Sequence, residues 1–258
     1  MISLYTTAFN LGNFGFSLED ALSNWLYYVD EVVISTLASQ VEEIKNEVKE
    51  TGFCDSVKIV APDLNINEDL YWVGKLKDAS LKKCSHDVVI QADFDERISG
   101  PKETLYELAK EIKTHDFSCS IMLPTIDLYE DLNHYMTIGN KWYLHTRKGT
   151  NRGAVNFGIK EDGSIDPEKS DTCELIDDKG NLVPCIGRVD FNEKDPKIIH
   201  LGYLNLNTRN EINKNFWSQM WRLRTGSKSN DCEATVFTSE DPRKKPHHLK
   251  HPLWPTIK

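Results

Sequence analysis

The stretch DVVIQADFDERIS, residues 87–99, leads from an apolar segment directly into a cluster of charges. Its first half contains three consecutive β-branched apolar residues, a pattern typical of a strand that is covered on both faces of a sheet. Asp93, Asp95 and Glu96 follow at once, and then Arg97. A strand core excludes charge, whereas a divalent cation held at a strand end takes several oxygen ligands at short spacing. The stretch therefore predicts a buried strand with a cation site at its carboxyl end; the alternative is a solvated loop start in which Arg97 pairs with a carboxylate.

The chain before this stretch alternates between strand and helix patterns. Strands are predicted at 2–9, 31–36, 56–62 and 87–92, and helices at 17–30, 39–52, 67–84 and 101–114. Ser17 with Asp20, and Ser39 with Glu42, match N-terminal capping patterns, and Gly52 is suited to end the second helix. Alternating strands and helices form right-handed crossovers and a mostly parallel sheet with helices on both faces. The first half is therefore predicted to be α/β.

The second half has a less regular pattern. After about Phe117, strands are predicted at 117–123, 137–147 and 197–203, but long polar stretches join them, and 208–226 has helical spacing. Beyond Gly226 the chain is polar and Pro-rich. We expect a single domain over 1–226, with a nucleotide-binding half at 1–116 and an acceptor half at 117–226, followed by a loosely packed polar tail at 227–258.

Composition excludes several classes of protein. The 258-residue chain has a formal net charge of −9, which argues against nucleic acid as a partner because that interaction depends on clustered Lys and Arg. Its six cysteines form no C-x-x-C pair, so a zinc ribbon is not expected and reduced thiols are. The start lacks a signal-peptide pattern, and no apolar run is long enough to span a bilayer. We expect a cytoplasmic protein without an integral membrane segment.

The order of elements, with Asp-x-Asp after the fourth strand, resembles the GT-A glycosyltransferases of the family-2 type, which transfer sugars from nucleotide diphosphates. Two segments carry this resemblance: VDEVVIST, residues 29–36, and KLKDASLKKCSHDVVIQADFDERIS, residues 75–99. The resemblance covers the first half well and the second half loosely. It implies a GT-A-like three-layer sandwich and a metal-dependent, inverting transfer of a sugar to a glycan or another hydroxyl acceptor, with Mn²⁺ or Mg²⁺ as cofactor.

The resemblance also implies residues for the donor and metal site. Asp95 is expected to contact the metal directly, and Asp93 is expected near the sugar, the ribose or the metal. Lys75 lies in a helix where relatives often carry a basic residue near the phosphates, although a solvated helix face is an equal alternative. The nucleoside is expected against the residues that follow the first strand: Thr6, Thr7, Ala8 and Asn10. The second strand ends in STLASQ, residues 35–40, where many relatives have an acidic residue that reads the base, so the base is not assigned.

The second half contributes a histidine and candidate acids. His200, in KIIHLGY at 197–203, corresponds to a late His-containing segment at the donor site of relatives and is predicted to bind the metal or a phosphate; the alternative is a satisfied core histidine. An inverting enzyme needs a carboxylate as general base. Asp171 or Glu174, in the segment 170–178, is the first choice, and the segment 127–135 competes with it. Each acidic segment is also compatible with a solvated loop.

A basic loop lies between these two acidic segments. Residues 145–158, HTRKGTNRGAVNFG, include Arg152 among glycines, and such a loop can offer guanidinium and amide donors to a departing diphosphate. An exposed basic turn is the alternative for Arg152.

Two further functions remain open. A sugar-phosphate nucleotidyltransferase builds a similar sheet and uses similar metals, but NLGNFG at 10–15 is a weak version of its Gly-rich loop. A non-catalytic carbohydrate-binding protein of the same fold is the other alternative. It is less favoured because a pure binder does not need three carboxylates together at a strand end.

Overall fold

The first half of the chain contains the alternating strands and helices that the sequence predicts. A computed structural model describes residues 1–8, 17–65, 72–129, 134–153, 158–159, 165–166, 174–192, 194–203 and 247–248. The strands of the first half are β1 (Ile2–Thr7), β2 (Glu31–Ser35), β3 (Val57–Val60), β4 (Val88–Gln91) and β5 (Glu96–Ser99). The helices are α1 (Leu18–Tyr28), α2 (Val41–Thr51), α3 (Trp72–Lys83) and α4 (Lys102–Lys113), with 3-10 turns η2 (Ala38–Gln40) and η3 (Cys54–Ser56).

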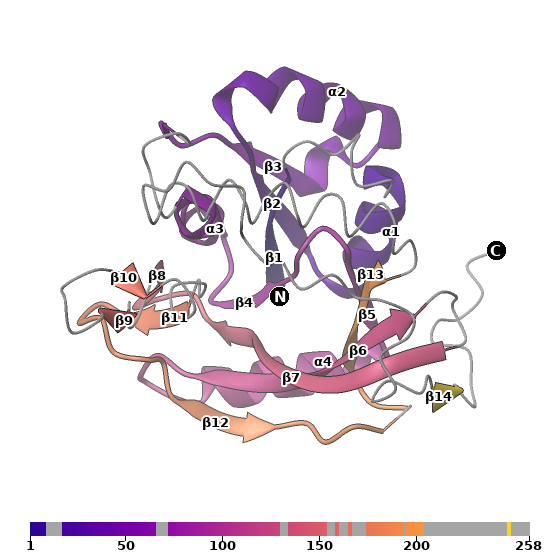
Figure 1. Ribbon diagram of the computed structural model, residues 1–258, viewed down its shortest axis with the longest axis vertical. Coiled ribbons are helices and arrows are strands. Elements are labelled where there is room, and N and C mark those ends of the chain that lie inside the picture. Colours follow the sequence, from indigo (N-terminus) through magenta and orange to yellow (C-terminus); the bar gives the residue numbers. More distant parts are fainter. Residues whose placement is uncertain are drawn as a thin grey trace.

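The second half is built mainly from strands. The long pair β6 (Ser120–Tyr129) and β7 (His134–Thr146) crosses the lower part of Figure 1. The shorter strands are β8 (Thr150–Gly153), β9 (Gly158–Ile159), β10 (Ile165–Asp166), β11 (Glu174–Asp177), β12 (Cys185–Arg188), β13 (Lys197–Tyr203) and β14 (His247–His248). The predicted helix at 208–226 and most of the predicted tail at 227–258 lie outside the described residues. Within that tail, His247–His248 pairs with β7.

One sheet of ten strands organises the described part of the chain. Its order is β3-β2-β1-β4-β7-β6-β13-β5, with β12 pairing with β6 and β14 with β7. Strands β3, β2, β1 and β4 are parallel, as crossover helices require. Beyond β4 the sheet is mixed, because β7 runs antiparallel to both β4 and β6, and β5 runs antiparallel to β13. Two separate two-stranded ladders are formed by β8 with β11 and by β9 with β10.

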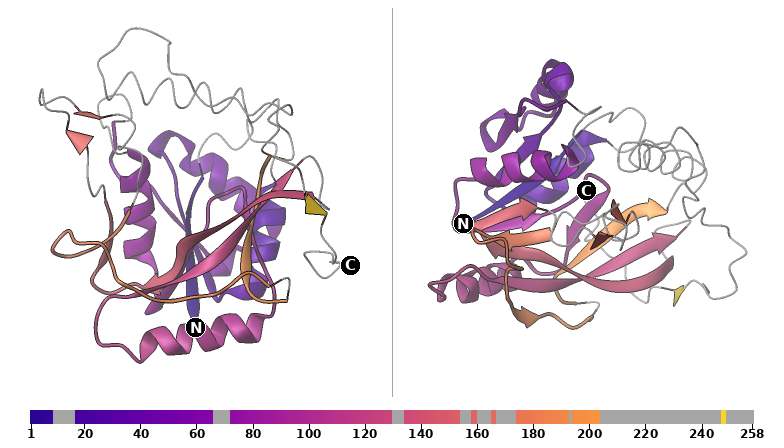
Figure 2. Two further views of the ribbon diagram at one scale, coloured as in Figure 1. Left: turned by 60° about the horizontal axis from the view of Figure 1, so that its bottom comes forward. Right: turned by 60° about the vertical axis from the view of Figure 1, so that its left-hand side comes forward.

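The helices cover the two faces of this sheet. Alternate strand residues point to opposite faces. Leu4 and Ile90 belong to a core cluster that also contains side chains of α1, α2 and α4, whereas Tyr5 and Val89 pack with Leu81 of α3. Helix, sheet and helix layers are visible in the two further views (Figure 2). The fold is therefore an α/β, GT-A-like three-layer sandwich with a less regular second half, as predicted.

The helix ends agree only in part with the predicted caps. Ser17 caps α1, since its hydroxyl accepts a hydrogen bond from the Asp20 backbone N–H at 3.3 Å. Gly52 ends α2 in the left-handed conformation, with φ at 78°. The predicted capping pair Ser39 and Glu42 is wrong, because Ser39 lies inside the turn η2, and α2 begins after Gln40 without a side-chain cap.

Helix α1 covers the outer edge of β5. The Asn24 side chain makes two hydrogen bonds with the backbone of Ile98, to its oxygen at 3.0 Å and from its nitrogen at 2.8 Å. The Trp25 indole donates to the Glu96 carbonyl oxygen at 3.0 Å. These contacts satisfy backbone groups that an edge strand otherwise leaves unpaired. Among the described helices, none is both long enough and apolar enough to cross a lipid bilayer.

Candidate active site

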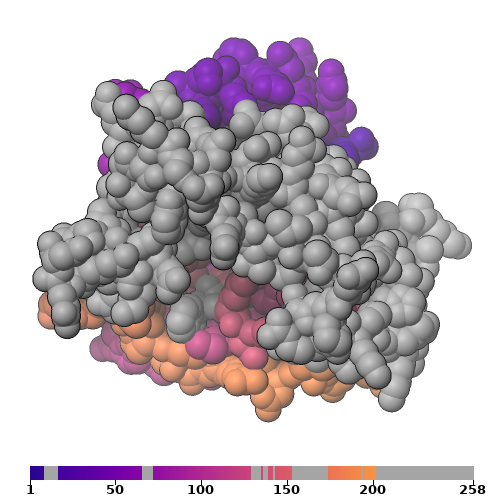
Figure 3. Space-filling view, in the orientation of Figure 1, coloured from indigo at the N-terminus to yellow at the C-terminus, as the bar shows by residue number. Residues whose placement is uncertain are grey.

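The Asp-x-Asp motif occupies a tight turn between β4 and β5. The Glu96 backbone N–H donates to the Asp93 carbonyl at 2.9 Å, and the Asp93 backbone N–H donates to Glu96 Oε2 at 2.7 Å. This turn lies at the carboxyl end of β4, the edge of an open α/β sheet at which ligands bind. In the space-filling view, atoms of the pink part of the sequence, to which β7 belongs, are visible in a hollow at the centre of this face (Figure 3).

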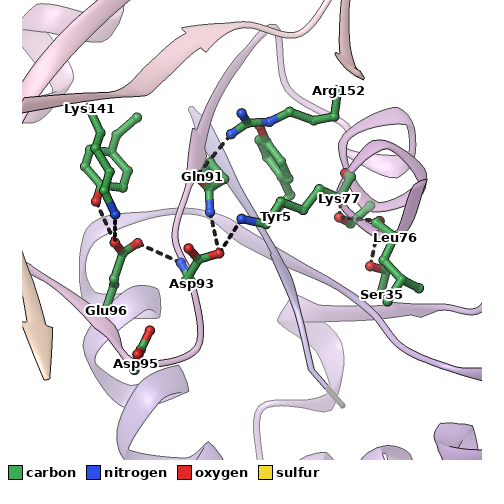
Figure 4. Close-up of polar contacts among 12 residues, drawn as sticks. Tyr5, Ser35, Leu76, Lys77, Gln91, Asp93, Asp95, Glu96, Lys141 and Arg152 are labelled. Carbon is green, nitrogen blue, oxygen red and sulfur yellow. Dashed lines mark hydrogen bonds and ion pairs between the residues drawn. The ribbon is translucent and has the colours of Figure 1, made fainter. Parts of the chain in front are cut away.

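Glu96 and Arg97 have structural roles. The Glu96 side chain is 1% exposed, and its Oε1 accepts from Tyr143 OH at 2.5 Å and from Lys141 Nζ at 3.1 Å (Figure 4). The proximity of the Glu96 carboxylate outweighs burial and raises the pKa of Lys141. Arg97 is buried and pairs with Asp20 at 2.8 Å. Of the three carboxylates after the strand, Glu96 therefore supports the turn, and Asp93 and Asp95 remain as candidates for ligand binding.

Asp93 is held by two donors on a single oxygen. Lys77 Nζ lies 2.6 Å from Asp93 Oδ1, and Gln91 Nε2 donates to the same oxygen at 2.9 Å. Burial opposes the charge of Asp93, but the ammonium groups of Lys77 and Lys141 more than offset it, so the pKa of Asp93 is lowered. Lys75, the helix residue predicted to lie near the phosphates, is exposed on α3. It is Lys77, two residues further on, that contacts the motif.

Asp95, His200 and Asp127 form a carboxylate–imidazole–carboxylate row. His200 Nε2 lies 3.1 Å from Asp95 Oδ2, and His200 Nδ1 lies 2.9 Å from Asp127 Oδ1. Burial disfavours a charged imidazole, but the two carboxylates outweigh it and raise the pKa of His200 to about 10. Asp127 opens the segment 127–135 that competes with 170–178 for the general base. The structure thus brings together His200 and Asp95, which the sequence analysis assigned to one site.

Arg152 also reaches the motif, through Gln91. Its Nε donates to Tyr5 OH at 2.7 Å, and its terminal NH2 group donates to Gln91 Oε1 at 3.0 Å. Its guanidinium lies over the Tyr5 ring, 5.5 Å from the centroid. The backbone N–H of Arg152 donates to Asp78 on α3 at 3.0 Å. Arg152 is therefore a bound part of the strand-end site and not an exposed turn residue.

The predicted nucleoside contacts lie at the end of β1. Thr6 is completely buried, and within the described residues its Oγ1 has no hydrogen-bond partner. Ala8 is 1% exposed, and its N–H donates to the Ser35 carbonyl at 2.9 Å, which joins the ends of β1 and β2. Asn10 lies outside the described residues. The buried, unpaired hydroxyl of Thr6 is a polar group that a ligand or a neighbouring segment can satisfy.

The two predicted base candidates are only partly described. Asp171 lies outside the described residues. Glu174 begins β11 opposite Gly153 of β8, next to the pair formed by Leu175 and Arg152. Because successive residues of a strand point to opposite faces, Glu174 is on the face of this ladder opposite to Arg152. In the part of the chain that the structure describes, no group of three or more His, Cys, Asp or Glu side chains is placed to hold a metal.

Several residues of the site were not identified from the sequence: Tyr5, Lys77, Gln91 and Lys141. They come from β1, α3, β4 and β7, and each contacts the motif or Arg152. Only strand pairing brings β7 beside β4, so no local pattern indicates Lys141. Helix α3 contains Lys75 and Lys77 in its first half, and which of them reaches the motif depends on how the helix packs on the sheet.

The sheet order and the three layers define the chain as a GT-A-like α/β protein. No protein family matches the sequence, and no curated protein does. Among solved structures, residues 1–349 of S. aureus TarS in complex with UDP are similar, with 21% identity and a TM-score of 0.34 over 62% of this chain and 39% of that one. The match therefore spans less than half of the TarS chain.

Two other solved structures are similar over larger shares of their own length. HddC from Yersinia pseudotuberculosis has 13% identity and a TM-score of 0.42 over 78% of this chain and 93% of that one. The 4-diphosphocytidyl-2C-methyl-D-erythritol synthase from Anaerococcus prevotii has 11% identity and a TM-score of 0.32 over 56% and 69%. Because one fold hosts many chemistries, the function has to be argued from the site.

Proposed function

We propose that this protein transfers a sugar from a nucleotide-diphosphate donor to a hydroxyl of a glycan or another acceptor, with Mn²⁺ or Mg²⁺ as cofactor and inversion at the sugar carbon. The observation that carries this proposal is the meeting of Asp95 Oδ2 and His200 Nε2, 3.1 Å apart, beside Asp93 at the strand-end edge of the sheet. A carboxylate and an imidazole converge there from two distant segments of the chain, which supports their assignment as metal ligands.

The donor set suits a divalent cation. Metal-binding histidines usually have their second ring nitrogen held by a carboxylate, and His200 Nδ1 is held by Asp127 at 2.9 Å. Mg²⁺ usually takes one or two protein carboxylates, and substrate phosphates complete its shell. Asp95 and His200, with Asp93 next to them, would therefore hold the metal, with the Nε2 proton of His200 released on binding. The bound cation supplies Lewis-acid stabilisation of the departing diphosphate.

Protein cations near the motif complement the charge of the donor. Lys77 is next to Asp93, Lys141 is half-exposed beside Glu96, and Arg152 adjoins Gln91. Preorganised cations of this kind stabilise negative charge that develops on a leaving group. The nucleoside is assigned to the end of β1, where the Thr6 hydroxyl has no hydrogen-bond partner among the residues that the structure describes.

The general base is assigned to the acidic segment that contains Asp171 and Glu174. A carboxylate in reach of the acceptor hydroxyl removes its proton as the sugar is transferred. Asp127 competes for this role by sequence, but its contact with His200 supports a positioning role.

The test compares two Asp→Asn variants at opposite ends of β4. Asp95→Asn should abolish Mn²⁺-dependent hydrolysis and transfer in a screen of nucleotide sugars. Asp87→Asn is the matched control, because the Asp87 side chain is 75% exposed and, within the described part of the chain, its one ion pair is a 3.7 Å contact with Lys113. Unchanged turnover by Asp95→Asn would remove Asp95 from the mechanism.

Two further readouts distinguish the alternative functions. Pyrophosphate release from a sugar phosphate and a nucleoside triphosphate would identify a nucleotidyltransferase. Glycan binding that is independent of Mn²⁺ and nucleotide, without turnover, would identify a carbohydrate-binding protein. Thermal shift with nucleoside diphosphates, with and without Mn²⁺, reports donor binding directly, since selective binding raises the melting temperature.

A further inference from the structure

A buried histidine begins a chain of oriented hydrogen bonds that ends at Asp93. His145 is fully buried on β7, and its Nδ1 lies 2.8 Å from the Thr146 carbonyl oxygen, which can only accept. The proton is therefore on Nδ1. Burial, together with the nearby Arg152, lowers the pKa of His145 to about 3, so the ring is neutral. Its Nε2 is consequently an acceptor, and it lies 2.8 Å from Tyr5 OH.

Tyr5 connects His145 to Arg152 through its hydroxyl group. The Tyr5 hydroxyl has one proton, which it donates to His145, so its oxygen is left to accept from Arg152 Nε at 2.7 Å. The Tyr5 ring is completely buried, and the guanidinium lies against its face. The plane of the Arg152 guanidinium is thus held by both a hydrogen bond and a ring contact.

Arg152 in turn decides which way the Gln91 amide faces. A guanidinium can only donate, so the Gln91 atom that lies 3.0 Å from the NH2 group of Arg152 is the amide oxygen. The Gln91 nitrogen then faces Asp93 and donates to Oδ1 at 2.9 Å (Figure 4). The direction of each bond from His145 to Asp93 is therefore fixed by the chemistry of the groups along it, because the guanidinium can only donate and the Asp93 carboxylate can only accept.

The series of hydrogen bonds leaves the two oxygens of Asp93 in different environments. Oδ1 receives both Gln91 and Lys77, whereas Oδ2 receives no hydrogen bond from any described residue. The Asp93 side chain is 38% exposed. The anchored oxygen points inward to β4 and α3, and the second oxygen is left to meet a ligand.

We propose that His145, Tyr5 and Gln91 are positioning residues that hold the Arg152 guanidinium and turn Asp93 so that its Oδ2 faces the bound donor. This inference rests on the proposed function, since the donor is the ligand it positions for. None of the three residues is assigned a contact with the reacting atoms. They act by reducing the number of orientations that Arg152 and Asp93 adopt before the donor binds.

Two variants interrupt the series of hydrogen bonds at different places and keep the shape of the side chain. Tyr5→Phe keeps the ring and removes the hydroxyl between His145 and Arg152. Gln91→Glu keeps an acceptor for Arg152 but presents a carboxylate to Asp93 in place of a donor. Tyr106→Phe is the matched control, because it also loses one tyrosine hydroxyl, in this case one that donates to Asp30 at 2.7 Å at the opposite edge of the sheet.

The first measurement is calorimetric binding of UDP, GDP, CDP and ADP in the presence of Mn²⁺. For the nucleotide that binds the wild-type protein, the dissociation constant should rise about tenfold or more in Tyr5→Phe and in Gln91→Glu, as expected for loss of hydrogen bonds to charged groups. Tyr106→Phe should stay within about twofold of the wild-type value. Wild-type affinity in both test variants would overturn the proposal.

The second measurement is NMR of the Gln91 side-chain amide and of the Arg152 Nε–H group, and it needs no ligand. Tyr5→Phe should shift both signals, whereas Tyr106→Phe should shift neither. An unmoved Gln91 amide in Tyr5→Phe would show that the orientation is not transmitted, and would overturn the proposal. If the wild-type protein binds none of the nucleotides, the proposed function has failed, while the NMR signals still decide whether the chain of bonds exists.

Discussion

His200 Nε2 lies 3.1 Å from Asp95 Oδ2, although 105 positions separate the two residues in sequence. The pairing of β13 with β5 brings them together, since His200 is opposite Glu96 in that ladder and the Leu201 N–H donates to the Asp95 carbonyl at 2.8 Å. A slip of one residue in this register would turn His200 to the other face of the sheet. The candidate metal site therefore depends on one strand register.

Asp127→Asn should weaken Mn²⁺ binding about 10- to 100-fold, because Asp127 orients His200 and adds to its basicity without being placed as a ligand itself. Calorimetric titration of Mn²⁺ into the protein with a saturating nucleoside diphosphate measures this effect. Asp190→Asn is the control, since the Asp190 side chain is 94% exposed. Equal Mn²⁺ affinities for the two variants would contradict the role given to Asp127.

Lys77→Met should weaken binding of the nucleoside diphosphate about tenfold, whereas Lys75→Met should change it by less than about threefold. Lys77 Nζ pairs with Asp93 and its side chain is only 13% exposed, so its loss leaves an unbalanced carboxylate facing an anionic ligand. Lys75 is exposed on the same helix. Thermal shift and calorimetry with the same nucleotide compare the two variants, and a larger effect at Lys75 would restore the assignment made from sequence.

Gly100→Ala should destabilise the protein by about 3 kcal/mol or more, as the sum of backbone strain and a steric clash. Gly100 has φ at 106°, and a Cβ there would lie 2.6 Å from the backbone oxygen of Asp195, where β5 approaches β13. Gly52→Ala isolates the strain, because Gly52 has φ at 78° with nothing within 4 Å of its Cβ position. It should cost about 1–2 kcal/mol. Urea unfolding of both variants measures the difference, and equal costs would argue against the close approach.

Glu31 should make stability depend on pH in acid. Burial opposes its ionisation, but the Lys58 ammonium, the Ser3 hydroxyl and the Ser85 N–H more than offset burial and lower its pKa from 4.5 to about 2. Because the pKa is lower in the folded protein, its contribution is full above about pH 4.5 and is lost as the pH falls towards 2.

The contribution should be about 2 kcal/mol, less than the whole shift implies because Lys58 is half-exposed. Urea unfolding at pH 7 and pH 3 should therefore differ less for Glu31→Gln than for the wild-type protein. An unchanged difference would mean that Glu31 is not the group responsible.

The sequence by itself determined the α/β class, the alternation of strands and helices in the first half apart from β5, which it did not predict, and the position of the charged motif after β4. These features come from local periodicity and from short-range rules such as the Ser17 cap and the Gly52 helix end, which need no distant partner. It also selected Asp95 and His200 for one site, on the basis of a family resemblance.

Only the tertiary structure decided which charged side chains of the motif support the fold and which are left to bind a ligand. Glu96 became a buried support because β7 brings Tyr143 and Lys141 to it, and Lys77 rather than Lys75 reached Asp93 because of how α3 packs on the sheet. Arg152 was joined to Asp93 through Gln91 by the same means. Such contacts depend on strand register and helix packing between segments far apart in the chain, and local sequence patterns do not record them.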